Sequence, residues 1–411
     1  MSEWKTYRLG DIIQLKSGGT PDKSNPDYWG GSIPWISAKS MYDDFISTSD
    51  LFITEEGLQA GSKIAKKDSI LLLTRGSGLF NRIPVCYVVS DVAYNQDVKN
   101  IVLKQENVTS IKFLYYWLYG NKELLSSMLE TTGIGAGKID TKRFLNLSIS
   151  LPSQKEQARY IHLMDLLFDK IELNRRINAN LEAQAQALFR SWFVDNETQN
   201  NNPRFFNDII QTTLSGDWGQ ETPKGNYISE VYCIRGADIP DIKCGDKGKL
   251  PTRYILEKNL KNKKLSENDL VVEISGGSPT QSTGRICLIT RALLDRLGKD
   301  VICTNFCRAL KPIPDYSFFI YLYWQYLYNN NTMFSYENGT TGIKNLNITD
   351  FINKEPIIIP EKKKILEFNK VLQPFFDMIY KNGRESEYLS ALRDTLLPKL
   401  MTGEIKIKKS Y

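Results

Sequence analysis

The sequence predicts an α+β protein made of two mixed α/β domains and two long antiparallel helices that form a coiled-coil spacer. Three observations predict it. The motif TTGI occurs at Thr131–Ile134 and again at Thr340–Ile343, each copy leads through an apolar stretch to a proline, and a long helical pattern follows each proline. From Pro152 and Pro360 onward, the two copies align at a constant offset of 208 residues. A repeat of this length indicates two duplicated domains rather than a solenoid.

The sequence predicts the first domain over residues 1–152, as a set of short strands with one helix. Runs such as SILLLTRGSG and IPVCYVVS are apolar or β-branched and are bounded by Gly, Pro, Asn and Asp, which is typical of strands. The aromatic segment SIKFLYYWLYGNKELLSSMLE predicts the helix.

Residues 212–360 predict the second domain, because the same segments follow in the same order. EVYCIRGADI takes the place of SIPWISAKSM, ENDLVVEISGGS that of KKDSILLLTRGS, and YSFFIYLYWQYLY that of the aromatic helix. The loops agree poorly between the two copies. The duplication therefore predicts one architecture with two different surfaces.

The sequence predicts the first long helix over residues 153–196. Ser153 and Glu156 have the spacing of a capping box. Apolar residues and asparagines then recur at alternating steps of three and four, which is a heptad seam: Met164, Leu167, Ile171, Asn174, Asn178, Leu181, Ala185, Leu188 and Trp192.

The sequence predicts the second long helix over residues 361–404. Its seam follows from the 208-residue offset: Leu372, Phe375, Ile379, Asn382, Ser386, Leu389, Arg393, Leu396 and Leu400. Pro374 and Gly383 are expected to kink or loosen it. A buried asparagine at the centre of each seam would fix the register of the pair. Each helix would run about 60 Å at 1.5 Å per residue. The pair is expected to pack antiparallel and to act as a rigid spacer.

Two segments are expected to lie outside these elements. The polar, Asn-rich stretch ETQNNNPRFFNDIIQ at 197–211 predicts a linker, and 405–411 predicts a basic C-terminal tail.

The bulk composition is that of an ordinary globular protein. The chain has 411 residues, 41% hydrophobic and 24% charged, with a formal net charge of +6 and a pI near 8.7. This mild basic excess is compatible with nucleic acid. No stretch approaches the ~20 apolar residues of a membrane span, and the N-terminus lacks the order of a signal peptide. A cytoplasmic protein is expected.

Cysteine and histidine usage argues against metal and catalytic sites. The six cysteines contain no CxxC pair, and His162 is the single histidine, on the flank of the first long helix. A histidine-based metal site and the usual nucleophile pairs are therefore not expected. The cysteines are expected to be reduced and mostly buried.

Two motifs resemble catalytic loops and fail on inspection. TTGIGAGK at 131–138 lacks the Ser or Thr after the lysine that a phosphate-binding loop needs. NPDY at 25–28 lacks the second proline of the NPPY-type methyltransferase signature and is better explained as a turn. No catalytic residue is expected.

The remaining notable feature is the polar and basic composition of matched turns in both domains. TRGSGLFNR and GAGKIDTKR in the first, and SGGSPTQSTGR and TGIKNLN in the second, place Arg, Lys, Asn, Gln, Ser and Thr beside glycines. These side chains can hold phosphates or base edges. They also occur in ordinary solvated loops, and the duplicated placement favours binding.

At this point the chain resembles the specificity subunit of a type I restriction-modification system, over essentially its whole length. The resemblance rests on four segments in order: GGTPDKSNPDYWGGSIPWI near the N-terminus, TTG before a proline and helix, LFRSWFVDNE ending the first helix, and LRDTLLPKLMTGEI ending the second. It implies a non-catalytic protein in which each domain binds one half of a bipartite, asymmetric double-stranded DNA target. The helices would set the gap between half-sites.

The resemblance also implies partners and cofactors. Two modification subunits would dock on the helices, carry S-adenosylmethionine and methylate adenine, and restriction subunits would hydrolyse ATP with Mg and cleave DNA. This chain would itself bind no cofactor or metal, and no membrane.

The resemblance further implies sets of site residues. DNA-facing residues of the first domain would be Lys16, Ser17, Thr20, Lys39, Arg75, Ser77, Arg82, Lys138, Lys142 and Arg143. Those of the second would be Arg235, Lys243, Lys249, Arg253, Ser278, Gln281, Arg285, Lys344 and Asn345. The helix and partner interface would use Leu181, Leu188, Phe189, Trp192, Phe193, Leu389, Leu396, Leu397 and Leu400.

Two other functions stay open from the sequence. One is a coiled-coil adaptor that binds proteins and not DNA. The other is a stand-alone DNA-modifying enzyme whose site is too divergent to be seen.

Overall fold

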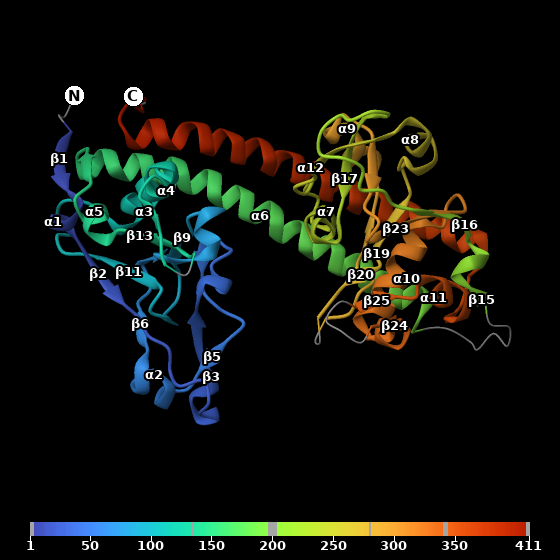
Figure 1. The fold of residues 1–411 in the computed structure, drawn as a ribbon, viewed down its shortest axis with the longest axis horizontal. Coiled ribbons are helices and arrows are strands. Elements are labelled where there is room, and N and C mark those ends of the chain that lie inside the picture. The colour runs from blue at the N-terminus through green and yellow to red at the C-terminus, as the bar shows by residue number, and fades with distance from the viewer. Residues whose placement is uncertain (1–3, 134, 196–203, 279–280, 340–343, 408–411) are drawn as a thin grey trace. The chain divides into compact units, whose positions relative to one another are not determined.

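The computed structural model describes residues 4–133, 135–195, 204–278, 281–339 and 344–407. The chain forms two compact units: unit 1 comprises Met1–Asp169 and Ser390–Tyr411, and unit 2 comprises Lys170–Leu389. Helices α6 (Gln154–Phe193) and α12 (Lys362–Met401), the long green and red helices of Figure 1, each contribute residues to both units. The predicted fold class is confirmed. The second copy of the TTGI motif lies outside the described residues, as does Ile134 of the first.

Unit 1 is built from short strands arranged in small sheets, with short helices between them. Its strands are β1 (Lys5–Arg8), β2 (Ile13–Ser17), β3 (Trp29–Ile36), β4 (Phe45–Ile46), β5 (Phe52–Ile53), β6 (Lys63–Ala65), β7 (Ile70–Leu73), β8 (Arg75–Gly76), β9 (Val85–Val88), β10 (Val92–Tyr94), β11 (Val98–Leu103), β12 (Leu129–Thr131), β13 (Gly137–Ile139) and β14 (Ser148–Leu151). Its short helices are α1 (Leu9–Ile12), α2 (Glu55–Gly61), α3 (Ile111–Gly120), α4 (Lys122–Ser126) and α5 (Thr141–Leu145), with 3-10 turns η1 (Pro26–Tyr28), η2 (Ala38–Ser40) and η3 (Ser77–Phe80).

Unit 2 uses the same kinds of elements. Its strands are β15 (Arg204–Phe205), β16 (Ile210–Ser215), β17 (Tyr227–Ile234), β18 (Thr252–Leu256), β19 (Leu270–Glu273), β20 (Ser275–Gly276), β21 (Ile286–Leu288), β22 (Val301–Cys303), β23 (Cys307–Pro312), β24 (Glu337–Asn338), β25 (Lys344–Leu346) and β26 (Pro356–Ile357). Its short helices are α7 (Ile239–Lys243), α8 (Glu257–Lys263), α9 (Arg291–Leu297), α10 (Ser317–Asn329) and α11 (Ile348–Lys354), with turns η4 (Phe206–Asp208), η5 (Gly236–Asp238) and η6 (Thr332–Tyr336).

The duplication extends to strand pairing. The sheet order β2-β11-β7-β9 of unit 1 recurs as β16-β23-β19-β21, and β12-β13-β8 recurs as β24-β25-β20. The parallel pair β3 and β10 recurs as the parallel pair β17 and β22. The two domains are therefore copies of one topology.

The core strands are apolar because they are covered on both faces. All four residues of β7 and of β19 are buried, and the aromatic helices α3 and α10 carry most of their rings into the cores of their units. Strands buried on both faces read as continuous apolar runs rather than as alternating patterns. This explains why SILLLT and DLVVE could be recognised in the sequence.

Each unit packs its aromatic helix on a phenylalanine of a long helix, at positions related by the repeat offset. In unit 1, Phe168 of α6 lies 5.3 Å from Tyr116 between ring centroids. In unit 2, Phe376 of α12 stacks on Phe318 at 4.8 Å. The buried phenylalanine is one position beyond Phe375, which the seam predicted.

The two long helices pair antiparallel within unit 2, as predicted. The Asn178 amide donates to the Ile379 carbonyl, and the Asn382 amide donates to the Asn178 side chain, each at 2.9 Å. Asn174, 0% exposed, donates to the Ser386 hydroxyl at 3.2 Å. The centre of the seam is thus a buried amide network, which resists slippage because a shifted register would leave the amides without partners.

Helix α12 continues through Pro374 and Gly383, the positions where a kink or loosening was expected. Gly383 has a different role. A Cβ there would lie 1.8 Å from the carbonyl oxygen of Gly245, the residue that follows α7 and Cys244. The glycine permits close contact between the helix and the second domain.

Part of the predicted linker and tail is structured. β15 pairs with β26, and Phe206 is fully buried, so 204–211 belong to unit 2. The sequence signal misled because the polar residues of this stretch surround one buried aromatic residue, Phe206. Ile407 of the predicted tail packs against the core of unit 1.

Candidate nucleic-acid interface

The first candidate site in unit 1 is the pair of strands β8 and β13. Arg75 and Lys138 are cross-strand partners, both side chains are exposed, and no described residue forms an ion pair with either. Gly76 follows Arg75 at φ 151° and ψ 155°, a conformation essentially open to glycine alone. The strand end therefore presents two unpaired cations side by side.

Lys99 of β11 extends this cluster. Its ammonium donates to the Ser17 hydroxyl at 2.6 Å and interacts electrostatically with Arg75. Burial lowers the pKa of Lys99; Asp97 opposes that effect and Arg75 adds to it. Nearby Thr20 donates to the Gln96 side chain at 2.6 Å. Arg75, Lys99 and Lys138, which we call the unit 1 cation cluster, form a site suited to an anion.

The equivalent site in unit 2 has different residues. Strands β20 and β25 pair Ser275 with Asn345 at the positions of Arg75 and Lys138. Lys344 lies next to Asn345, and its ammonium is 3.0 Å from the Glu337 carboxylate. Arg308 of β23 pairs with Ser215 of β16, in the register in which Lys99 pairs with Ser17.

A cavity of about 270 Å³ in unit 2 brings together three predicted DNA-facing residues. Lys243, Gln281 and Arg285 line it, with Gln325 and Tyr328 among the other lining residues. The Lys243 ammonium is hydrogen-bonded to the Gln325 side chain. The cavity thus gathers amide, phenol and basic groups against an apolar wall.

Several predicted arginines are bonded within the protein. Arg285 makes a bidentate pair with Glu273 at 2.7 and 2.6 Å, and the pKa of its guanidinium is raised by that hydrogen bond. Arg253 is 5% exposed and donates to the Trp218 carbonyl at 2.7 Å. Their guanidinium groups support the fold of unit 2.

Arg235 and Arg82 are engaged in the same way. Arg235 pairs with Asp238, which is 2% exposed, at 2.9 Å. Arg82 donates to the carbonyl of Tyr42 at 3.2 Å and to that of Met41. Arg235 also lies beside Lys249, whose carbonyl accepts from the guanidinium at 2.9 Å.

The other predicted residues are distributed over strands, short helices and loops. In unit 1 the exposed ones are Lys16, Lys39, Ser77, Lys142 and Arg143. In unit 2, Lys249 is exposed, and Ser278 accepts from the Gln281 backbone at 3.0 Å. These residues are not brought into the clusters described above.

Sequence reasoning missed Lys99, Gln96 and Arg308. Lys99 and Arg308 stand in strand-like segments, DVKNIVLK and FCRALKP, which the turn-based search for polar and basic residues did not cover. The internal repeat could have revealed them, because both follow the matched apolar strands and face a serine.

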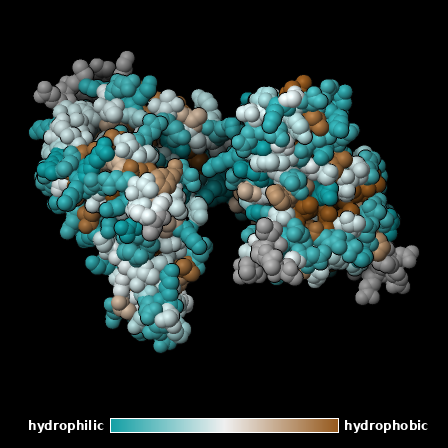
Figure 2. Space-filling view, viewed as in Figure 1, coloured by the Kyte–Doolittle hydropathy of each residue, from teal (hydrophilic) through white to brown (hydrophobic). Residues whose placement is uncertain are grey.

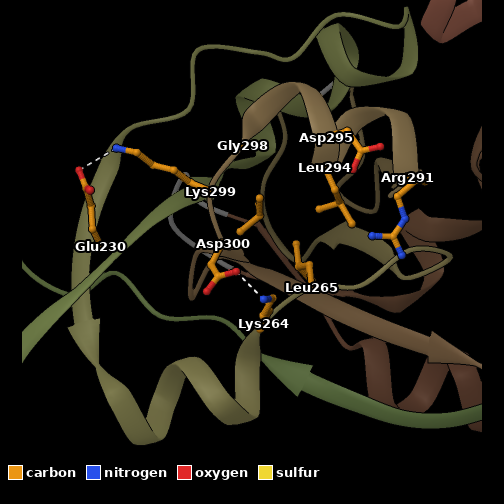
Figure 3. Close-up of a pocket in the computed structure, with 10 residues that line it drawn as sticks. Glu230, Lys264, Leu265, Arg291, Leu294, Asp295, Gly298, Lys299 and Asp300 are labelled. Atoms are coloured by element: carbon orange, nitrogen blue, oxygen red, sulfur yellow. Dashed lines mark hydrogen bonds and ion pairs between the residues drawn. The ribbon is translucent and has the colours of Figure 1, made fainter.

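A larger hollow in unit 2, about 640 Å³, lies among α8, α9 and β17. Figure 3 shows ion pairs on its wall, Lys299 with Glu230 and Lys264 with Asp300. Arg291 pairs with Glu267 at 3.3 Å. Because its bases pair with acids, this hollow does not offer a cluster of one charge.

The helix-end residues predicted for the interface fall into both cores. Phe189 and Phe193 are buried in unit 2, with Leu181, Leu188 and Trp192 packed against them. Leu397 and Leu400 are buried in unit 1, with Leu396 packed alongside. Leu389 is partly buried. Most of these side chains therefore hold the domains to the helices.

The surface and composition of the sites agree with a polar ligand. Hydrophilic residues cover most of the face shown in Figure 2, and hydrophobic ones form small patches. Within the described ranges, no helix has the length and apolarity to cross a bilayer, and no group of three or more His, Cys, Asp or Glu side chains could hold a metal ion.

The comparisons with known proteins show which proteins this chain is similar to. Residues 1–183 match the family described as "Type I restriction modification DNA specificity domain". The chain is 27% identical over 436 residues to the Type I restriction enzyme MjaIX specificity subunit of Methanocaldococcus jannaschii, covering 99% of this chain and 94% of that protein. It is 25% identical over 475 residues to the HindI specificity subunit of Haemophilus influenzae, covering 98% and 100%.

A solved structure shares the fold over the whole chain. The S subunit of a type I restriction-modification system from M. genitalium has a TM-score of 0.50 at 15% identity, covering 100% of this chain and 97% of that one. This likeness concerns the fold. In sequence, the chain is similar over nearly its whole length to specificity subunits of type I restriction-modification systems, and residues 1–183 match their DNA specificity domain.

Proposed function

We propose that this chain selects the DNA sequence for a type I restriction-modification complex, with each unit binding one half of a bipartite target. The main observation behind this proposal is that one topology occurs twice with different side chains at matched strand ends. These are Arg75 and Lys138 in unit 1, and Ser275 and Asn345 in unit 2. A symmetric scaffold with unlike contact residues is suited to an asymmetric pair of half-sites.

The chain's part in methylation is to place DNA, and it supplies no reacting group. The specificity-subunit family is non-catalytic. S-adenosylmethionine, ATP and Mg would therefore be bound by partner subunits. Two modification subunits would use the long helices as their docking surface, and restriction subunits would join through them.

The roles of the helices follow from their contacts. Their central amides and the aromatic contacts at Phe168 and Phe376 fix how each domain is attached. A rigid attachment is needed if the helices set the gap between half-sites, since base contacts depend on placement within about an ångström.

Reconstitution tests this function directly. The chain is mixed with the modification subunit and with radiolabelled S-adenosylmethionine, and methyl transfer to plasmid DNA is measured. We expect adenine methylation only when both proteins are present. Methylation by this chain alone would favour a stand-alone enzyme, and unchanged partner activity with no DNA affinity would favour an adaptor.

A further inference from the structure

The starting observation is a substitution between the two units at structurally matched positions. Strand β7 leads through Thr74 into β8, and β19 leads through Ile274 into β20, each ending on a glycine with φ near 150°. The first residue of each short strand and its cross-strand partner are Arg75 with Lys138 in unit 1. In unit 2 they are Ser275 with Asn345.

A second matched position is conserved in chemistry. Lys99 faces Ser17 across β11 and β2, and Arg308 faces Ser215 across β23 and β16. Both units therefore have one cation next to one hydroxyl. The neighbouring strand-end pair carries two positive charges in unit 1 and none in unit 2.

Acidic groups enlarge this difference. In unit 2, Glu337 is 3.0 Å from the Lys344 ammonium and also accepts from the Thr283 hydroxyl at 2.9 Å. Glu273, 4% exposed, neutralises Arg285. In unit 1, no described carboxylate forms an ion pair with Arg75, Lys99 or Lys138, and Glu130 lies across from Lys138 in the register of β12 and β13. The unit 1 site therefore carries more positive charge than the unit 2 site.

We propose that these strand-end pairs are DNA contacts that distinguish the two half-sites. Unit 1 uses the cations Arg75 and Lys138, and unit 2 uses the hydroxyl of Ser275 and the amide of Asn345. Lys99 and Arg308 supply one phosphate contact common to both. This inference rests on the proposed function and adds the residues that make the two halves unlike.

The chemistry of the side chains gives the consequence. Arginine and lysine bind phosphate oxygens or the O6 and N7 acceptors of guanine, whereas asparagine can pair with adenine and carries no charge. A contact through cations releases counterions, and a contact through neutral groups does not. Unit 1 should therefore carry more of the salt dependence of binding.

The geometry around Lys99 supports an anion in unit 1. Its ammonium donates to the Ser17 hydroxyl at 2.6 Å, and its pKa is lowered, first by burial and to a lesser degree by the charge of Arg75. A bound phosphate would offset the repulsion between these two charges.

The test measures DNA affinity of the complex with its modification subunit at several salt concentrations. Three proteins are compared: wild type, Arg75→Ser/Lys138→Asn, which gives unit 1 the residues of unit 2, and Ser275→Ala/Asn345→Ala. The unit 1 variant should lower the slope of log K against log salt by about 1.8, from about 0.9 per lost phosphate contact. The unit 2 variant should keep the wild-type slope.

A matched control removes two charges elsewhere in unit 1. Lys66→Ser/Lys67→Ser alters exposed lysines before β7, at the end opposite Arg75. It should keep the wild-type slope. Thermal unfolding checks that each variant is folded, and Arg75→Gln/Lys138→Gln provides a more conservative second variant.

Methylome sequencing of cells that express each complex separates phosphate from base contact. If Arg75 or Lys138 contacts bases, only one half-site of the motif relaxes, as proposed. If the motif is kept and the salt slope falls, both residues contact phosphates, and their role in distinguishing the half-sites is overturned. A folded unit 1 variant with wild-type slope and motif overturns the proposal, as does an equal slope change in the control. A wild-type complex without a defined motif would instead contradict the proposed function, while the slopes still decide whether the cations touch DNA.

Discussion

At the scale of single residues, Gly76 shows how a backbone constraint sits beside a contact residue. Its φ of 151° with ψ of 155° is essentially restricted to glycine, and Gly276 in the matched turn has φ 148°. Both follow the residue that we assign to DNA. The duplicated turn therefore preserves the conformation while the side chain before it changes.

Gly76→Ala should destabilise unit 1 by about 1–3 kcal/mol, because the conformation strains any residue with a Cβ. Gly78→Ala is the control, since a Cβ at Gly78 meets nothing within 4 Å and its φ is not positive. Chemical denaturation of the two variants measures the difference. Equal stability would show that the turn tolerates side chains.

Thiol reactivity tests burial at the same scale. Burial raises the pKa of Cys86, Cys233 and Cys307 to about 12, and it raises the pKa of Cys287 and Cys303 as well. A higher pKa leaves less thiolate at neutral pH, and thiolate is the reactive form.

Cys244 is exposed, although its own pKa is raised by partial burial. Native protein treated with a maleimide at pH 7.5 should therefore gain one label, slowly, at Cys244. Mass spectrometry counts the labels, and denatured protein should gain six. Rapid labelling of several thiols in native protein would contradict the predicted burial.

Residue roles were harder to predict than residue types. Arg253 lies in β18 and Arg285 at the end of a polar turn, and their acidic or carbonyl partners lie 12 to 35 positions away, where no local pattern connects them. Lys99 was hidden in a strand. A guanidinium's partners are decided by tertiary packing, which a single sequence does not contain.

At the scale of elements, the long helices were the best predicted part. A heptad seam and entry prolines are local signals, and α6 and α12 begin one residue after the predicted starts. The buried amides at Asn174, Asn178 and Asn382 also followed from the seam. The contact of Phe376 with α10 did not follow from the seam, which named Phe375 instead. Phe376 lies outside the seam and packs against α10.

Gly383→Ala should destabilise the protein by about 1–3 kcal/mol through overpacking. Its Cβ would lie 1.8 Å from the Gly245 carbonyl oxygen, and Gly245 has φ 83°. Neither backbone can easily withdraw. Lys381→Ala, at an exposed position two residues away, should change stability by less than about 0.5 kcal/mol. Similar unfolding midpoints for the two variants would contradict the close contact.

At the scale of the whole molecule, the repeat explains both what the units share and how they differ. Sheet order, glycine turns and aromatic helices recur, so the fold class could be predicted from the duplication. The contact surfaces could not, because the loops carry different residues and the pairing of Arg75 with Lys138 joins positions 63 apart.

Lengthening both long helices tests their proposed role as a spacer. Seven residues inserted at matched positions beside Asn174 and Asn382 add about 10 Å to each helix, at 1.5 Å per residue. With bases about 3.4 Å apart, the gap between half-sites should grow by about 3 base pairs. The half-sites should be unchanged; altered half-sites would show that the helices do more than space the units.

The central claim is that two copies of one fold bind two unlike half-sites. Methylome sequencing of cells that express this chain with its modification subunit tests it most directly. We predict methylated adenines in a single bipartite motif whose two halves differ and are separated by a fixed gap. A continuous motif, two identical inverted halves, or methylation without a motif would contradict the account.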